Sequence, residues 1–239
     1  MVVNNPISGV KYLLQGFKLL NSPGLRRYVI MPLLINVLIF SLMVWIGVVQ
    51  FENLLDWMLP QDSWISYFRY ILWPIFAIAA ILVTFYSFTI IANLLAAPFN
   101  GILAEKVEIM LTGKNPSQMH AGILQSIWPA VRSELIKLRY FVIRALPLLI
   151  LFLIPGINLI APILWTLFGI WYLALEYADY PMANNGLEFK DQHAHNKKIR
   201  LSAMGFGGGL TLLMMIPILN FAAMPAAVAG ATAMWCDRL

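Results

Sequence analysis

The chain alternates between long stretches without charge and shorter charged segments. Asp, Glu, Lys and Arg are absent from residues 28–51, 70–104, 145–175 and 201–236. A helix needs about 20 consecutive apolar residues to cross the hydrocarbon core of a bilayer. The pattern therefore predicts an all-α membrane protein with an upright transmembrane helix over 28–51. The second stretch is too long for one upright crossing and predicts a long, tilted or kinked transmembrane helix over 70–111.

Paired prolines interrupt the third and fourth uncharged stretches near their middles. Pro155 and Pro162 flank Asn158, and the same pattern recurs around Asn220. Because proline removes a backbone donor and disfavours helix at the preceding residue, each pair predicts a turn at membrane depth. The arms beside each turn are about 10–15 residues long and reach only about halfway through a bilayer. Both stretches are therefore predicted to form re-entrant helical hairpins, with Asn158 and Asn220 at the apices.

The distribution of basic residues favours these hairpins over the alternative of one kinked crossing for each of 145–175 and 201–236. If only the first two stretches cross, fifteen Lys and Arg residues lie on one side of the membrane and only Arg69 lies on the other. A single crossing by the third stretch would move the four basic residues of segment 176–200 to the opposite side. Since positive residues concentrate on the cytoplasmic side, the count predicts cytoplasmic termini.

Two further segments place apolar residues at helical spacing outside the uncharged stretches. Residues 5–20, inside the N-terminal segment 1–27, predict an amphipathic helix at the membrane interface. Its apolar face contains Ile7, Val10, Leu14 and Phe17. Residues 117–141 predict a separate amphipathic cytoplasmic helix, after which the chain returns to the membrane near Arg144. All these segments together form one predicted membrane domain, 1–239.

Composition supports a membrane protein and argues against other classes. Hydrophobic residues make up 61% of the 239 residues and charged residues 11%, whereas soluble domains carry about 25% charged residues. The net charge of +5 is expected from basic flanks of membrane segments and not from a nucleic-acid-binding surface. Nucleotide-binding, zinc-protease and hydrolase motifs are missing, and His193 and His195 supply only two ligands for a metal. We therefore expect no enzymatic activity, no cofactor and no resident metal.

The strongest candidate for chemistry is the sequence Asn-Ser-Pro-Gly-Leu-Arg-Arg, which begins at Asn21 and precedes the first transmembrane stretch. Asn21 and Ser22 are typical helix caps, and Pro23 suits a first helical turn. The free N–H groups and the dipole at a helix start attract anions. Two guanidinium groups add bidentate donors that match a tetrahedral oxyanion. The alternative is that Arg26 and Arg27 are ordinary positive flanks of a membrane helix.

Several motifs resemble those of the CysZ family, sulfate transporters of the bacterial inner membrane. They follow one another along nearly the whole chain, at residues 22–34, 92–101, 154–156, 179–181, 215–220 and 229–235. The resemblance implies sulfate import for cysteine synthesis, and a fold of two long transmembrane helices with two partly inserted hairpins. It also implies a homo-oligomer, whose subunits can lie in opposite orientations, whereas the positive charges here favour one orientation. The anion site of the family falls on Gly24, Leu25, Arg26 and Arg27 of this chain.

The membrane potential limits how sulfate can enter. A potential of about 100 mV, negative inside, opposes entry of a dianion by about 4.6 kcal/mol, which equals a gradient of about 2,000-fold. A channel therefore needs very low internal sulfate, whereas a proton or sodium symporter does not. The candidate coupling groups are Glu105, Glu108, Glu134, Glu176 and Asp179. Asn158 and Asn220 are expected to line or close the path.

The alternative function is a non-transporting membrane scaffold that recruits a partner through its cytoplasmic helices. This hypothesis predicts that both arginines can be neutralised without any change in sulfate flux. The choice among sulfate, sulfite and thiosulfate as substrates stays open.

Overall fold

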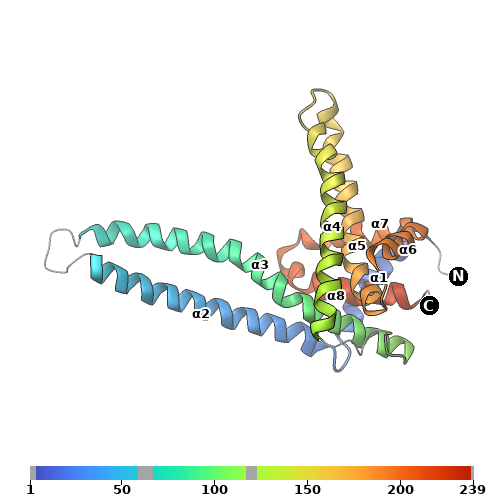
Figure 1. Ribbon diagram of the computed structural model, residues 1–239, viewed down its shortest axis with the longest axis horizontal. Helices are drawn as coiled ribbons and strands as arrows, with labels where there is room; N and C mark the ends of the chain where they lie inside the picture. Colours follow the sequence, from blue (N-terminus) through green and yellow to red (C-terminus); the bar gives the residue numbers. More distant parts are fainter. Residues whose placement is uncertain (1–3, 59–66, 117–122, 238–239) are drawn as a thin grey trace. The chain divides into compact units, whose positions relative to one another are not determined.

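The computed structural model describes residues 4–58, 67–116 and 123–237 (Figure 1). All regular structure within these ranges is helical, which confirms the predicted all-α class. The elements are α1 (Pro6–Leu20), α2 (Arg26–Met58), α3 (Arg69–Thr112), α4 (Ile123–Leu151), the 3₁₀ helix η2 (Ile157–Leu159), α5 (Ala161–Asn184), α6 (Phe189–Lys198), α7 (Arg200–Met214) and α8 (Pro217–Cys236).

The chain divides into two compact units. The first, which we call the long-helix unit, is Arg27–Phe99 and contains most of α2 and the first part of α3. The second, which we call the core unit, combines the described parts of Met1–Arg26 and Asn100–Leu239. The core unit therefore contains α1, the last turns of α3 and all later helices.

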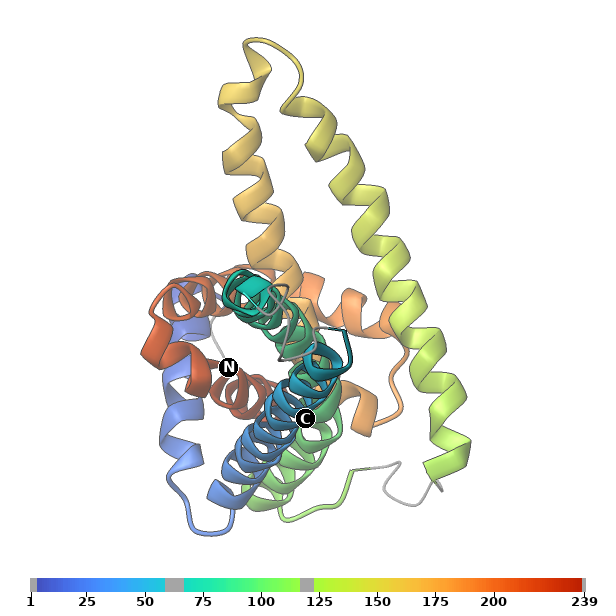
Figure 2. The ribbon, with the colours of Figure 1, turned by 90° about the vertical axis from the view of Figure 1, so that its left-hand side faces the viewer.

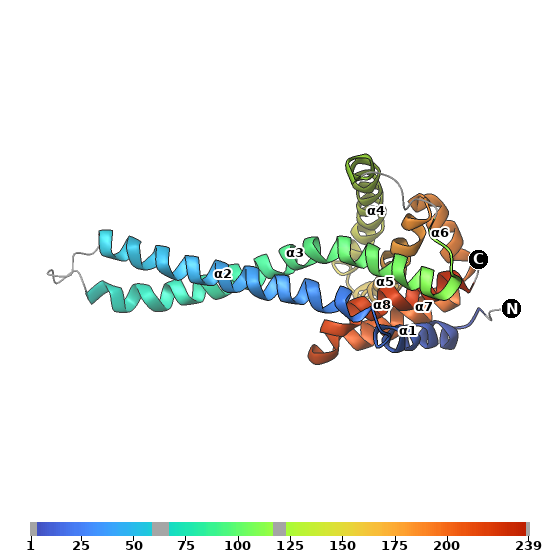
Figure 3. The same cartoon turned by 90° about the horizontal axis from the view of Figure 1, so that it is seen from below.

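In the long-helix unit, α2 and the first part of α3 run antiparallel and side by side (Figures 1 and 3). Phe51 of α2 stacks on Phe76 of α3, with the ring centroids 3.8 Å apart. Apolar side chains of α2 also point outward, and Leu38 is 69% exposed. The segment Val37–Trp57 is long and apolar enough to cross a membrane, and it overlaps the transmembrane helix predicted over 28–51.

Helix α3 is continuous over 44 residues and covers the whole range 70–111 that the sequence predicts as one helix. Neither Pro74 nor Pro98 ends it. At 1.5 Å per residue it is about 66 Å long, about twice the thickness of a bilayer's hydrocarbon core. Only part of α3 can therefore lie in a membrane at any moderate tilt.

Small residues bring α1 against α7 and α8 in the core unit. A Cβ atom added at Gly9 or Gly205 would collide with the backbone of the facing segment, and one at Gly16 would collide with α8. Gly209 of α7 faces the side chain of Leu13. Such close backbone approach is typical of helices that pack through small residues in membranes.

The buried face of α1 differs from the apolar face that its sequence predicts. The buried residues are Gly9, Tyr12, Leu13 and Gly16. Ile7 and Leu14, which belong to the predicted face, are 67% and 52% exposed. The small residues face the core because they permit backbone contact, which larger side chains would prevent. The larger apolar side chains stay on the outer surface, where Lys11 and Lys18 also lie.

Helices α4 and α5 rise to a common apex over residues 152–160 and form a helical hairpin (Figure 2). Gly156 reverses the chain there with φ of +85° and precedes η2. The segment Ala161–Asn184 is the second helix long and apolar enough to cross a membrane. The predicted turn between Pro155 and Pro162 therefore lies where the sequence places it.

The arms of this hairpin are longer than predicted, at 29 residues for α4 and 24 for α5. The sequence predicts a separate helix over 117–141 and a hairpin arm that begins at residue 145. In the structure, both belong to the single helix α4 from Ile123 on. Residues 117–122 lie outside the described part of the chain. The prediction fails because it ends helices at charged residues, which a helix accommodates well. Helix α5 instead continues to a turn at Gly186, whose φ is +78°.

The second hairpin, α7 and α8, turns at Met215 and Ile216, just before the paired prolines and not between them. Pro217 begins α8, where its missing N–H costs no hydrogen bond, and Pro225 lies inside the helix. Asn220 is therefore helical, and its backbone N–H donates to the Ile216 carbonyl at 2.9 Å. This corrects the predicted apex position at Asn220.

Candidate anion site

A short loop joins α1 to α2 and contains the predicted anion-binding residues. Asn21 is the C-cap of α1, and the Ser22 N–H donates to the Leu19 carbonyl at 2.9 Å. Helix α2 begins only at Arg26, so Pro23 stands in the loop and not in a first helical turn. The predicted capping roles are wrong, because Asn21 and Ser22 hydrogen-bond backward to α1 and thereby end that helix.

Gly24 and Leu25 give the loop its shape. Gly24 has φ of +91°, a conformation that residues with a Cβ rarely adopt. No atom of the described residues lies within 4 Å of a Cβ placed there, so the loop backbone faces open space. The Leu25 side chain is only 4% exposed, and its N–H donates to the Ser22 carbonyl at 3.3 Å. The buried leucine thus anchors the loop, while the glycine keeps its outer side accessible.

Arg26 and Arg27 are the first two residues of α2, and both are exposed. The first backbone N–H groups of a helix have no intrahelical partner, and the helix dipole adds positive potential there. Among the described residues, no carboxylate forms an ion pair with either arginine. The Arg27 guanidinium lies 4.9 Å from the ring centroid of Tyr28. Two accessible guanidinium groups therefore stand at a helix N-terminus without a described counter-charge.

The two asparagines predicted to line a path lie in different hairpins. Asn158 is in η2 at the α4–α5 apex, and its N–H donates to the Ile154 carbonyl at 2.9 Å. Asn220 is in the first turn of α8. Both are exposed, and no described contact joins them. The structure therefore places them separately, and their role in a path stays a prediction.

The predicted coupling carboxylates have unequal surroundings. Glu105 accepts a hydrogen bond from Lys106 Nζ at 2.7 Å near the surface. Glu176 is half-buried on α5. The side chain of Glu134 lies outside the described residues. Of the four carboxylates whose side chains are described, Asp179 and Glu108 are buried, so their environments differ strongly from water.

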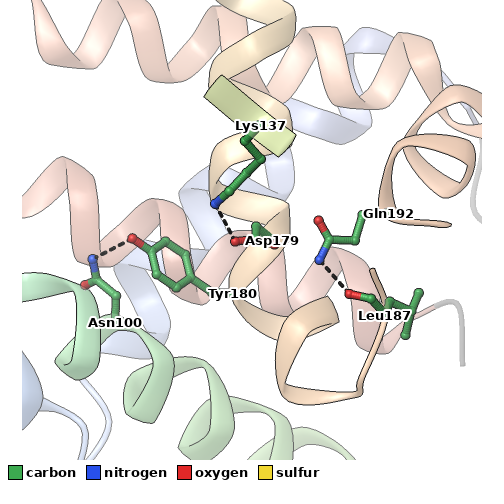
Figure 4. Close-up of polar contacts among 6 residues, drawn as sticks. All are labelled: Asn100, Lys137, Asp179, Tyr180, Leu187 and Gln192. Carbon is green, nitrogen blue, oxygen red and sulfur yellow. Dashed lines mark hydrogen bonds and ion pairs between the residues drawn. The ribbon is translucent and has the colours of Figure 1, made fainter. Parts of the chain in front are cut away.

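Asp179 of α5 forms a buried ion pair with Lys137 of α4, in which Nζ lies 2.7 Å from Oδ2 (Figure 4). The other carboxylate oxygen, Oδ1, is buried without a hydrogen-bond partner among the described residues. Beside it, Asn100 Nδ2 donates to the Tyr180 hydroxyl at 3.3 Å. The pair ties α4 to α5, and sequence reasoning missed it because its members are 42 positions apart.

Glu108 is 3% exposed and lies beyond the uncharged part of α3. Asn185 Nδ2 donates to both of its carboxylate oxygens, at 2.8 and 2.9 Å. Burial raises the pKa of Glu108 above its ordinary value, although the hydrogen bonds from Asn185 act in the opposite direction. This carboxyl can therefore hold a proton closer to neutral pH than an exposed glutamate can.

The turn between α5 and α6 is fixed by polar contacts of its own. Gln192 Nε2 donates to the Leu187 carbonyl at 2.9 Å (Figure 4). Gln192 is 2% exposed, and Asn196, one turn later, is fully buried. These contacts hold α6 against the core unit and place its basic residues beside α4 and α7.

Comparison with known proteins gives consistent matches over the whole chain. Residues 12–225 match the family model described as sulfate transporter CysZ/etoposide-induced protein 2.4. A protein of Pseudomonas aeruginosa PAO1 named sulfate transporter CysZ is 44% identical over 232 residues, covering 96% of this chain and 94% of that protein. A protein of the same name from Salmonella typhimurium LT2 is 43% identical over 235 residues, covering 97% of this chain and 93% of that protein.

Proposed function

Because the chain belongs to the sulfate transporter CysZ/etoposide-induced protein 2.4 family, we propose that it imports sulfate across the bacterial inner membrane for assimilation into cysteine. The observation that carries the proposal is the pair of exposed arginines in the first turn of α2, which form no ion pair with any described carboxylate. A dianion is the natural counter-charge for two adjacent guanidinium groups. Both the family and the local chemistry thus point to the same class of substrate.

The proposed capture site consists of Gly24, Leu25, Arg26 and Arg27. The arginines supply charge-assisted hydrogen bonds, and the N–H groups of the first turn of α2 add further donors. Gly24 allows the ligand to approach the backbone, since no described atom occupies the space where a Cβ would lie. Buried Leu25 holds these donors in place. The proposed substrate is sulfate, and sulfite and thiosulfate are oxyanions of similar charge that the same donors could accept.

The proposed membrane arrangement has α2 and α3 crossing the bilayer and the α4–α5 and α7–α8 hairpins entering it from the cytoplasmic side. The uncharged part of α5, from Ala161 to Leu175, is about 22 Å long. This length is shorter than the thickness of the hydrocarbon core of a bilayer, which is about 30 Å. The exposed apolar face of α1 lies at the membrane interface in this arrangement. Cytoplasmic termini follow from the excess of basic residues on that side. Assembly as a homo-oligomer completes the proposal.

Two mechanisms fit the proposed import, a channel and an ion-coupled symporter, and only the symporter needs a group that exchanges the coupling ion. Asp179 already has a positive partner in Lys137, so its charge is compensated within the core unit. Glu108 combines burial with a raised pKa and is the carboxyl best suited to exchange a proton during transport. A channel remains the simpler mechanism when internal sulfate is kept low by metabolism.

Equilibrium binding of radiolabelled sulfate to the purified full chain tests the capture site. We expect the Arg26→Ala/Arg27→Ala double variant to bind about 10–100-fold more weakly, since it loses two charge-assisted contacts. The matched control is Lys11→Ala/Lys18→Ala, which removes the same charge from exposed positions on α1 and should bind like the wild type. Unchanged binding by the arginine variant would contradict the site.

A further inference from the structure

A pocket of about 590 Å³ opens between α4, α5, α6 and α7 in the core unit. None of its lining residues belongs to the capture loop. One part of its wall is basic and consists of Arg144, Lys197 and Arg200. Another part is apolar and consists of Leu164, Leu167 and Phe168 of α5. The pocket is thus divided into a cationic and a hydrocarbon half.

The cationic half lacks a counter-charge of its own. No carboxylate lines the pocket, and among the described residues none forms an ion pair with Arg144, Lys197 or Arg200. Lys197 and Arg200 lie three residues apart across the junction of α6 and α7, and the fold brings Arg144 of α4 to them. An anion that enters the pocket would reduce their mutual repulsion.

Aromatic and polar side chains hold this half in place. The Arg144 guanidinium lies 3.8 Å from the ring centroid of Tyr140. Trp171 Nε1 donates to the Tyr140 hydroxyl at 2.9 Å, and that hydroxyl lies 3.3 Å from His193 Nε2. Burial lowers the pKa of His193, and the nearby charges of Lys197 and Arg144 lower it further. These contacts hold the Arg144 guanidinium at the wall of the pocket, where it is available to a negatively charged ligand.

The apolar half continues along a helix that the fold leaves uncovered. Leu164 and Leu167 are 37% and 44% exposed on α5, a helix that is long and apolar enough to cross a membrane. Further toward the apex, Ile163 and Ile160 are 60% and 54% exposed. A free oxyanion would leave this hydrocarbon surface bare, whereas a molecule with an acyl chain would cover it.

We propose that this pocket binds an anionic phospholipid, with the phosphate against Arg144, Lys197 and Arg200 and an acyl chain along α5. Basic pockets between helices at the cytoplasmic side of a membrane are suited to anionic headgroups. A zwitterionic lipid would bring its own cation into the basic half and fits it less well. The lipid would also fix α6 and α7 against the α4–α5 hairpin, since the three cations come from three of these helices.

Native mass spectrometry of the full chain, delipidated in neutral detergent, tests this proposal. The chain is titrated with phosphatidylglycerol and, separately, with phosphatidylcholine of the same acyl chains. We expect the wild type to retain phosphatidylglycerol about tenfold more tightly than phosphatidylcholine. The Arg144→Gln/Arg200→Gln variant should retain phosphatidylglycerol about tenfold more weakly than the wild type. Lys197→Gln, a milder change, should lose about threefold. The control Lys190→Gln/Lys198→Gln removes two exposed charges of α6 outside the pocket and should stay within about twofold.

Equal retention of the two lipids, or equal losses in the pocket and control variants, would overturn the proposal. Displacement of phosphatidylglycerol by millimolar inorganic phosphate alone would also overturn it, because the pocket would then hold a free anion. Sulfate binding at Arg26 and Arg27 is measured in the same variants by equilibrium binding. The capture site and the lipid pocket therefore stand or fall independently.

Discussion

Charged residues in this protein fall into two kinds that differ in what they can do. Arg26 and Arg27 are exposed and unpaired among the described residues, so their donors are available to a ligand. Lys137 and Asp179 are buried and paired at 2.7 Å, so their charges serve each other. A buried pair often contributes little net stability, but breaking it strands one charge in a medium of low dielectric constant.

The Lys137–Asp179 pair gives a prediction about stability. Lys137→Met should lower the free energy of unfolding by about 3–5 kcal/mol, because Asp179 is left without its counter-charge. Lys137→Met/Asp179→Leu should lower it much less, since no isolated charge remains. Unfolding in detergent, followed by circular dichroism, measures both. A single variant as stable as the double variant would show that the pair is not desolvated.

Residues adjacent in the chain could be predicted as a site, and residues brought together by folding could not. Arg26 and Arg27 are neighbours after a glycine, so the sequence alone identifies them as a candidate anion site. The basic half of the lipid pocket joins Arg144 to Lys197 and Arg200, more than fifty positions away. Nothing in the local sequence around Arg144 indicates that pairing.

The sequence predicts the turn between α4 and α5, where glycine and proline interrupt the helix. It does not predict the outer ends of these two helices, which were placed at charged residues. The α4–α5 turn lies between Pro155 and Pro162, as the sequence predicts, and Gly156 reverses the chain within it. The arms extend beyond the uncharged stretch, because Arg144 at one end and Glu176 at the other stay within helices. Pro225 inside α8 illustrates the converse, since a helix with packed neighbours tolerates one missing backbone hydrogen bond.

Packing of α1 on α7 gives a prediction at the level of these helices. Gly205→Ala should destabilise the protein by about 1–3 kcal/mol, because the new Cβ collides with the backbone of Pro6. Helix propensity alone would give the opposite sign. The control Gly169→Ala lies on α5 with no described atom within 4 Å and should stabilise by about 0.5–1 kcal/mol. Thermal unfolding in detergent measures both variants, and equal shifts would contradict the packing.

The whole molecule is basic, with a formal net charge of +5. The all-α class could be predicted from the charge-free stretches, whereas the capture residues stay a prediction from one loop. The division into a long-helix unit and a core unit could not, because it depends on contacts between distant helices. The proposed function of the whole molecule is a flux of sulfate across a membrane. Measurements of binding and stability alone therefore do not establish it.

Uptake of labelled sulfate into proteoliposomes containing the purified chain, under an imposed and then a reversed membrane potential, tests the central claim most directly. We predict that uptake rises when the inside is positive and falls when it is negative, because sulfate carries two negative charges. It should be lost in folded, inserted Arg26→Ala/Arg27→Ala and kept in Lys11→Ala/Lys18→Ala. Absence of uptake by inserted wild type at either polarity, or wild-type flux through the arginine variant, would contradict the account and favour a non-transporting scaffold.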